Sequence, residues 1–224
     1  MHRTHALPAL VAVVLLSTVA GSAGAQTGSA ASPPASAAPV AAAPRPAVEI
    51  DRAALPAALS EPAGVERRLF RDGRVYIAGQ PSEEALAKFK ELGVTAVVNL
   101  RTPQEMADRE EVPYDEAAAA ARLGLEYVHL PIGGPEHPWR PEVVDRLADV
   151  LERHRGPVLL HCTVAWRASY VWTAYLVRET GLSLDEALAR GRAIAITPDP
   201  LGELLGRRIE LSLADGPAPA AAQP

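Results

Sequence analysis

A buried strand that leads straight into the only cysteine is the feature that most constrains how this chain folds. Residues 158–160 are an apolar run, His161 and Cys162 follow it, and a helical pattern begins at Arg167. Consecutive apolar residues of this kind favour a strand that is buried on both faces. A strand, a short loop and a helix in this order predict a domain in which strands and helices alternate.

The loop between this strand and this helix has the chemistry of an anion-binding site. Backbone N–H groups in the first turn of a helix have no intrahelical partner, so they can bind an anion. Such a site stabilises the thiolate form of Cys162, and the planar fork of Arg167 can hold two oxygens of one anion. The pattern therefore predicts an enzyme that attacks an oxyanion-bearing substrate through Cys162.

Residues 1–25 have the pattern of a secretory signal peptide. A short basic start precedes an apolar run over residues 6–20, and an A-x-A cleavage site precedes Gln26. The apolar run is too short to span a membrane comfortably. We therefore expect residues 1–25 to be removed, and the mature protein to be periplasmic or secreted and to have no membrane span.

Composition divides the rest of the chain into one folded domain and two flexible segments. Residues 26–62 are mostly Ala, Pro, Ser and Gly, a composition that buries too little apolar surface to offset chain entropy. Residues 214–224 have the same composition. We expect a disordered linker over residues 26–62, one domain over residues 63–213, and a disordered tail over residues 214–224.

Charge and cysteine content narrow the possible partners. The formal net charge of −5 at neutral pH argues against nucleic acid or an anionic membrane as a partner. A single cysteine forms no internal disulfide, so we expect Cys162 to be a free thiol. The histidines lack the spacing of metal ligands, and the sequence contains neither a Walker loop nor a dinucleotide-binding fingerprint. We therefore expect neither a metal nor a cofactor.

Hydrophobic patterns predict an α/β domain with a largely parallel central sheet and helices on both faces. The strands that we expect cover residues 74–78, 94–100, 125–130 and 158–160. The helices that we expect begin after Ser82, at Asp115, at Pro141, at Arg167 and after Ser183, with a last one within residues 201–211. In such sheets, ligands bind beyond the carboxyl ends of the strands. Those ends carry Cys162, residues 99–101 and the loop 131–140.

The residues at these strand ends resemble a known family. His161 and Cys162 followed by Arg167 resemble the phosphate-binding loop of cysteine-dependent protein tyrosine and dual-specificity phosphatases. A Gly-Gln-Pro turn, the strand end 97–101 and the His-Cys loop follow one another in an order similar to that of the bacterial beta-lactamase-hydrolase-like phosphatase subgroup. The resemblance covers residues 69–191 and implies a single phosphatase-like domain.

The resemblance implies a role for each residue of the loop. Cys162 would be the nucleophile that forms a cysteinyl-phosphate intermediate, and Arg167 would bind the phosphoryl oxygens. Ser169 would hydrogen-bond the thiolate, and His161 would orient the loop. Arg101 would be either a cation on the substrate side or a salt-bridge partner. The backbone amides that would complete the phosphate site are those of Thr163, Val164, Ala165 and Trp166.

The loop departs from the common phosphatase pattern in three ways. Four residues separate Cys162 from Arg167, which is one fewer than in the common loop. None of them is glycine, although such loops have positions that favour a positive φ. The loop 131–140, which matches the acid-bearing loop of related enzymes, contains no aspartate, so Glu136 is the expected proton donor and His137 the alternative.

These departures leave two further functions open. Rhodanese-type sulfurtransferases share the shorter spacing and would carry a persulfide on Cys162. A catalytically weak module that binds phosphate groups would need neither the acid nor the glycine. The leading hypothesis is an exported phosphatase that acts on phosphotyrosine-like or other phosphomonoesters of a protein or a small molecule. The sequence makes no prediction of oligomeric state.

Overall fold

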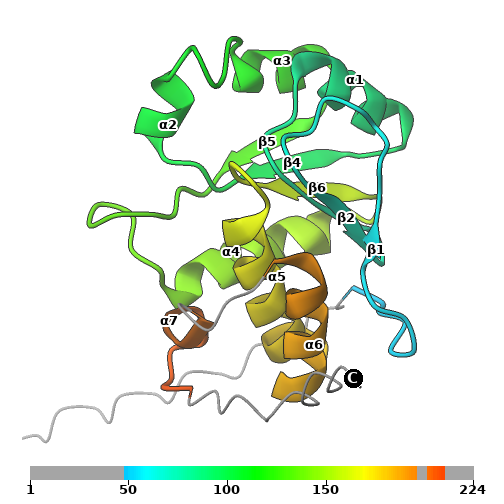
Figure 1. Ribbon diagram of the computed structural model, residues 1–224, viewed down its shortest axis with the longest axis vertical. Helices are drawn as coiled ribbons and strands as arrows, with labels where there is room; N and C mark the ends of the chain where they lie inside the picture. The colour runs from blue at the N-terminus through cyan, green and yellow to red at the C-terminus, as the bar shows by residue number, and fades with distance from the viewer. Residues whose placement is uncertain (1–47, 196–200, 210–224) are drawn as a thin grey trace, which may run out of the picture. The chain divides into compact units, whose positions relative to one another are not determined.

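The computed structural model describes residues 48–195 and 201–209, and the expected signal peptide and the expected tail lie outside these ranges. Within these residues, a six-stranded sheet has helices on both of its faces (Figure 1). This arrangement confirms the predicted α/β fold with a largely parallel central sheet.

Four parallel strands and two antiparallel ones form the sheet. The strands are β1 (Ala57–Ala58), β2 (Leu69–Asp72), β3 (Val75–Ala78), β4 (Ala96–Asn99), β5 (Glu126–His129) and β6 (Val158–His161). They lie in the order β1-β2-β3-β6-β4-β5, with β1 and β2 as the antiparallel edge. Ala78 of β3 and Asn99 of β4 both lie opposite His161, so three strand ends meet next to Cys162.

Two groups of helices cover the two faces of the sheet (Figure 1). On one face lie α1 (Glu83–Glu91) and α3 (Glu116–Arg122), and on the other lie α4 (Pro141–Arg153), α5 (Trp166–Glu179), α6 (Leu184–Ile194) and α7 (Leu201–Leu205). Alternate strand residues serve the two faces, because Val97 and Leu159 pack with the first group and Val98 and Leu160 with the second. A short helix, α2 (Pro103–Ala107), follows β4.

Local sequence signals set the starts of the helices. The Ser82 hydroxyl accepts a hydrogen bond from the N–H of Ala85 at the start of α1. Ser183 and Glu186 form a capping box at the start of α6, and Pro141 opens α4. These starts agree with the sequence predictions. Within the described ranges, no helix combines the length and the apolar character that crossing a membrane requires.

The folded domain begins earlier than predicted, because residues 48–62 are not a disordered linker. Val48 is buried and donates its N–H to the Tyr175 hydroxyl at 3.0 Å. Arg190 of α6 donates to the carbonyl of Asp51, and β1 pairs with β2. The Ala- and Pro-rich composition of this segment does not reveal its packing, because the apolar residues that Val48 contacts lie in distant parts of the chain.

Candidate active site

Cys162 lies at the carboxyl end of the central strand β6, where it begins the loop that leads into α5. Its N–H donates to the carbonyl of Ala78 at 3.2 Å, and the N–H of Leu100 donates to the carbonyl of His161 at 3.0 Å. The cysteine is a free thiol and is 1% exposed. It is therefore held between the ends of β3 and β4, on the buried side of the loop.

The bend of the loop falls on Ala165, which has a φ of +69°. This left-handed conformation favours glycine, because a Cβ atom there approaches the following backbone. Ala165 is fully buried and occupies the N-cap position of α5, so its surroundings hold it in this conformation. Ala165 thus provides the positive φ that we expected in a loop of this kind, although the loop contains no glycine.

The Gly-Gln turn after β3 holds the loop from one side. Gly79 forms an antiparallel bridge with Val164, and the N–H of Gln80 donates to the carbonyl of Thr163 at 3.0 Å. A Cβ atom at position 79 would lie 1.9 Å from the carbonyl oxygen of Glu66. Glycine is therefore required at this position by the close approach of two backbone segments.

The guanidinium of Arg167 lies close enough to the Cys162 thiol for the two groups to interact electrostatically. Its Nη1 donates to the carbonyls of Ile132 at 2.8 Å and Leu100 at 3.3 Å, which fixes its position. Burial opposes the charged form, but Glu105 and Cys162 outweigh burial and raise the pKa of Arg167 above its ordinary value. Arg167 is therefore a fixed cation beside the sulfur.

Glu105, which the sequence did not single out, binds Arg167 through both carboxylate oxygens. Its Oε2 accepts from Nη1 at 2.7 Å, and its Oε1 accepts from Nη2 at 2.5 Å. Oε1 also accepts from the hydroxyl of Thr163 at 2.9 Å, so the carboxylate contacts the loop itself. A bidentate pair of this kind fixes the plane of the guanidinium.

Glu105 is ionised at neutral pH. Burial alone would raise the pKa of this carboxyl, but hydrogen bonds from Arg167, the Thr102 N–H and Thr163, together with the charge of Arg167, lower it to about 2. Glu105 lies in the first turn of α2 and forms a capping box with Thr102. The Thr-Pro-Gln-Glu pattern of residues 102–105 could have revealed this helix from sequence, but not the contact with Arg167.

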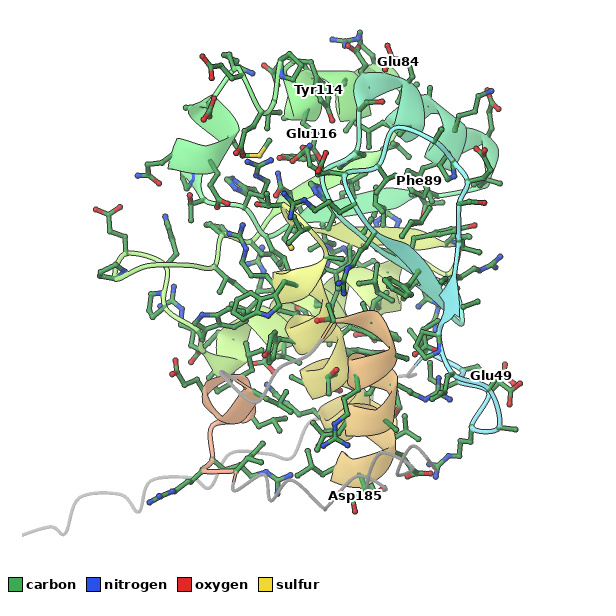
Figure 2. All side chains as sticks on the ribbon, in the orientation of Figure 1. Glu49, Glu84, Phe89, Tyr114, Glu116 and Asp185 are labelled. Carbon is green, nitrogen blue, oxygen red and sulfur yellow. The ribbon has the colours of Figure 1, made fainter. Side chains whose placement is uncertain are left out.

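A second carboxylate that sequence reasoning missed, Glu116, lies in a buried polar cluster behind the loop (Figure 2). Its Oε1 lies 2.7 Å from Nε2 of His161, and its Oε2 accepts from Nε2 of Gln80 at 2.9 Å. Asn99 contributes a longer contact of 3.4 Å. Burial opposes the ionised form, but His161, Gln80 and Arg101 outweigh it, so the pKa of Glu116 is lowered.

Arg101 makes the contacts of a salt-bridge partner. It is 1% exposed, and its Nη2 donates to Glu111 at 2.5 Å. Its Nη1 donates to Oε1 of Gln80 at 3.0 Å, which links the end of β4 to the Gly-Gln turn. Of the two roles that we expected for Arg101, these contacts favour the structural one.

Aromatic side chains pack around the end of the loop. The ring of Trp166 lies edge-on to those of Trp139 and Tyr170, with centroids 5.7 Å and 4.9 Å away. Ser169 lies in the following turn of α5, where its hydroxyl donates to the carbonyl of Trp166 at 2.7 Å. This contact within the helix takes the place of the hydrogen bond to the thiolate that the sequence suggested for Ser169.

Glu136 is exposed in the loop that follows β5. Together with Thr102 and His137 it lines an open hollow of about 490 Å³. The N–H of Gly133 donates to the carbonyl of His137 at 2.7 Å and closes the loop on itself. The structure thus places the expected proton donor at a neighbouring hollow, and Cys162 does not line that hollow.

A cavity of about 650 Å³ opens beside the loop. Thr163 and Val164 form its wall on the loop side, next to Gln80, Arg101 and Tyr114. A pocket of this size accommodates a small molecule or a side chain. Within the described part of the chain, no three potential metal ligands come together at this cavity or elsewhere. The carboxylates that line the cavity are those of Glu66, Glu83, Glu84, Glu110 and Glu111.

Residues 70–177 match the family model described as "Beta-lactamase hydrolase-like protein, phosphatase-like domain". The matched segment extends from β2 into α5 and includes both Cys162 and Arg167. The match confirms the resemblance seen in the His-Cys loop and, at the level of the family, the prediction of a phosphatase-type enzyme.

Solved structures also resemble this chain. Tk-PTP in its active form is 29% identical over 60% of this chain and 90% of its own length, with a TM-score of 0.49. A putative phosphatase from Shewanella putrefaciens is 24% identical over 64% of this chain and 91% of its own length, with a TM-score of 0.48. A search of curated proteins finds no match.

Proposed function

Because residues 70–177 belong to the beta-lactamase-hydrolase-like phosphatase domain family, we propose that this chain hydrolyses phosphomonoesters with Cys162 as the nucleophile. The observation that carries this proposal is that Cys162 and Arg167 lie at the two ends of one loop, between β6 and the first turn of α5, where the guanidinium and the thiol interact electrostatically. Glu105, the two carbonyls and the Thr163 hydroxyl all contact Nη1 or Nη2 of Arg167. In this proposal Nε serves the thiolate or a phosphoryl oxygen, and a phosphoryl oxygen at Nη2 takes the place of the Thr163 hydroxyl.

In the proposed reaction, Sγ of Cys162 attacks phosphorus, and an S–P bond forms as the P–O ester bond breaks. The leaving oxygen takes up a proton as it departs. Water then attacks the same phosphorus, the S–P bond breaks, and inorganic phosphate leaves with the thiolate restored. Arg167 and the backbone N–H groups of residues 163–166 stabilise the charge on the three phosphoryl oxygens during both steps.

Glu136 is the proton donor in this proposal, and His137 is the alternative. Both lie in the loop 131–140, which contacts Arg167 through the carbonyl of Ile132. Glu105 is unsuited to this task, because a pKa of about 2 keeps it ionised near neutral pH.

The variant Glu136→Gln tests the donor. Its kcat should fall more for an alkyl phosphate, whose leaving oxygen needs a proton, than for p-nitrophenyl phosphate, whose leaving group is stable as an anion. Steady-state rates on the two substrates give the comparison, and His137→Gln provides the parallel variant. Equal changes on both substrates would exclude Glu136 as the donor.

We also propose that the protein acts outside the cytoplasm, after cleavage before Gln26. The support is the basic start, the apolar run and the small residues of residues 1–25. Expression of the full chain in a Gram-negative host, followed by N-terminal sequencing of the periplasmic fraction, tests this step. A product that begins at Gln26 is expected, whereas full-length protein retained in the cytoplasm would contradict export.

A two-substrate assay tests the central proposal. Purified protein receives p-nitrophenyl phosphate in one arm and thiosulfate with cyanide in the other, and Cys162→Ser is measured in parallel. We expect turnover of the phosphate alone and a loss of about 1000-fold or more in the variant. Turnover that survives Cys162→Ser would remove Cys162 from the mechanism.

The same assay separates the two other functions. Thiocyanate formed from thiosulfate and cyanide would identify a sulfurtransferase that carries a persulfide on Cys162. If neither substrate reacts but tungstate raises the melting temperature, the chain is a phosphate-binding module instead of an enzyme.

A further inference from the structure

Glu116 and His161 form a fully buried pair directly behind the proposed nucleophile. Both side chains are 0% exposed, and Oε1 of Glu116 lies 2.7 Å from Nε2 of His161. His161 is the last residue of β6, so it immediately precedes Cys162. The proposed reaction uses neither side chain. Burying a carboxylate is energetically costly unless it is paired, so the contacts of Glu116 need an explanation.

The contacts of Glu116 all lead to strand ends that shape the loop. His161 ends β6, Asn99 ends β4, and Gln80 lies just beyond the end of β3. Gln80 donates its side-chain N–H to Glu116 at 2.9 Å and its backbone N–H to the carbonyl of Thr163 at 3.0 Å. One carboxylate therefore joins the three segments between which Cys162 is held.

The distance between the two side chains fixes a proton. Two unprotonated atoms at 2.7 Å would repel each other through their lone pairs, and the carboxylate of Glu116 can only accept. The two atoms are not aligned for a hydrogen bond, so a proton on Nε2 of His161 is what removes this repulsion. In catalytic sites of other folds, a carboxylate that contacts one nitrogen of a histidine fixes both the tautomer and the orientation of the ring.

We propose that Glu116 is a positioning residue, which holds the ring of His161 with its proton on Nε2 and thereby sets the shape of the loop around Cys162. The consequence for turnover rests on the proposed phosphatase function. The consequence for the reactivity of the thiol does not, because it concerns Cys162 in the absence of any substrate.

Other titratable groups face the pair from the neighbouring elements. Arg101 acts on Glu116 from the end of β4, and Arg167 lies on the loop side of Cys162. Tyr114 and Tyr127 approach from the start of α3 and from β5, and burial together with the charge of Glu116 raises the pKa of both hydroxyls. Both tyrosines are therefore neutral near pH 7 and add no charge beside the carboxylate.

The variant Glu116→Gln removes the charge and keeps the size of the side chain. The ring of His161 then loses the carboxylate that holds it, so the loop around Cys162 is held less firmly and its backbone N–H groups stabilise the thiolate less. We expect the midpoint of iodoacetamide alkylation of Cys162 to rise by about one pH unit. We expect kcat on p-nitrophenyl phosphate to fall about 10- to 100-fold with KM changed less than about threefold, because Glu116 contacts none of the phosphate-binding groups.

Two further variants define the comparison. Glu116→Asp keeps the charge and should restore part of the alkylation profile. Glu126→Gln is the matched control, because Glu126 makes a similar contact of 2.6 Å with His154 at the opposite end of the parallel strands. We expect Glu126→Gln to leave both the alkylation profile and kcat unchanged.

The outcomes decide the proposal. Alkylation that moves to lower pH would mean that Glu116 acts only as a negative charge behind the thiolate, and this would overturn the proposal. An unchanged profile with a lower melting temperature would show a purely structural role and would overturn it as well. Should Glu116→Gln not fold, the ¹⁵N chemical shifts of His161 in the unaltered protein decide, because a ring protonated on Nδ1 alone contradicts the proposal.

The alkylation experiment also separates this inference from the proposed function. A protein without phosphatase activity can still show the predicted shift in the reactivity of Cys162. Conversely, phosphatase activity together with identical alkylation of Cys162 in Glu116→Gln and Glu126→Gln would support the proposed function and contradict the positioning role of Glu116.

Discussion

Glu105 holds Arg167 by the edge that carries its two terminal nitrogens. The carboxylate takes one hydrogen bond from each of these nitrogens and a third from the hydroxyl of Thr163. Without it, Arg167 retains the carbonyls of Leu100 and Ile132 at Nη1 and the Thr163 hydroxyl at Nη2. Because the Thr163 hydroxyl itself donates to Glu105, the carboxylate holds both the guanidinium and the side chain that supports it.

Replacing the carboxylate should reduce activity. In Glu105→Gln, an amide N–H₂ faces the guanidinium in place of one oxygen, so one of the two parallel hydrogen bonds is lost. We expect kcat/KM for p-nitrophenyl phosphate to fall about 10- to 100-fold. Glu91→Gln, an exposed position on α1, is the control for steady-state kinetics. A loss in Glu105→Gln no larger than in that control would contradict the role.

Acid should lower the stability of the folded protein, because it protonates the carboxylate of Glu105. The pKa of Glu105 is about 2 in the folded protein against 4.5 as the reference value, so folding favours its ionised form. Its contribution to stability is complete above pH 4.5 and is lost as the pH falls toward 2. Urea unfolding at a series of pH values should therefore show a steeper loss in this window for the unaltered protein than for Glu105→Gln. Parallel curves of stability against pH for the two proteins would contradict this contribution of Glu105.

The positive φ of Ala165 makes a separate prediction. Ala165→Gly should change the free energy of unfolding by less than about 1 kcal/mol, because glycine adopts a φ of +69° freely but gives up a buried methyl group. Ala165→Val should cost about 2 kcal/mol or more, because a β-branched residue is strained at positive φ and overfills a buried position. Chemical denaturation of both variants measures the difference, and equal stability would refute the argument.

Residues close together in the chain were the ones that sequence could predict. Cys162 and Arg167 stand out because a strand pattern, a loop and a helix pattern lie in one short stretch. Glu105 and Glu116 come from other helices, and no local pattern distinguishes the carboxylate that reaches a loop from one that is hydrated. Glu136 was expected from its place in the chain, but its exposure depends on the path of a loop that contains two glycines.

Among the elements, the turn after β3 has the least freedom to change. Its backbone lies between the segment that contains Glu66 and the loop that contains Thr163. A Cβ atom at Gly79 would lie 1.9 Å from the Glu66 carbonyl oxygen and 3.0 Å from that of Thr163. Any side chain there must displace one of these two backbones, and displacing the second changes the loop that carries Cys162.

Gly79→Ala should therefore lose most activity and at least about 2 kcal/mol of stability. Gly181→Ala is the control, because its φ of +69° costs about 1 kcal/mol for a non-glycine residue while a Cβ atom there meets nothing within 4 Å. Activity per folded molecule separates the two cases, since only Gly79→Ala moves the loop. Full activity in folded Gly79→Ala would show that the loop is independent of this turn.

The long helices were predicted from sequence, as were the short helices α3 and α7, whereas α2 was not. α4 and α6 combine an apolar stripe with a proline or a capping box, so several local signals agree, whereas α5 was predicted from its apolar residues and its place after the strand and loop. α2 has five residues and no buried side chain, so it leaves no apolar period in the sequence. β1 and β2 are formed by pairing with each other and with β3, and pairing across the sheet has no local signature.

Across the whole domain, a buried ion pair joins the antiparallel edge of the sheet to the helices on one face. Asp72, the last residue of β2, accepts from Arg190 of α6 at 2.6 Å and from the indole of Trp172 in α5 at 2.9 Å. Arg190 also donates to the carbonyl of Asp51. The segment that precedes β1 is thus connected to α6 and, through Asp72, to α5, whose first turn carries Arg167.

This connection predicts that the segment before β1 contributes to the stability of the domain. Val48 is 3% exposed and packs in the core of the helical face, whereas Leu55, a few residues later, is 60% exposed. Val48→Asp in the full chain would bury an unpaired charge and should cost about 3 kcal/mol, whereas Leu55→Asp should change stability by less than about 0.5 kcal/mol. Thermal and urea unfolding of the two variants tests the difference. Equal stabilities of the two variants would indicate that residues 48–62 are a linker. The expected difference in stability would place the domain boundary at or before Val48.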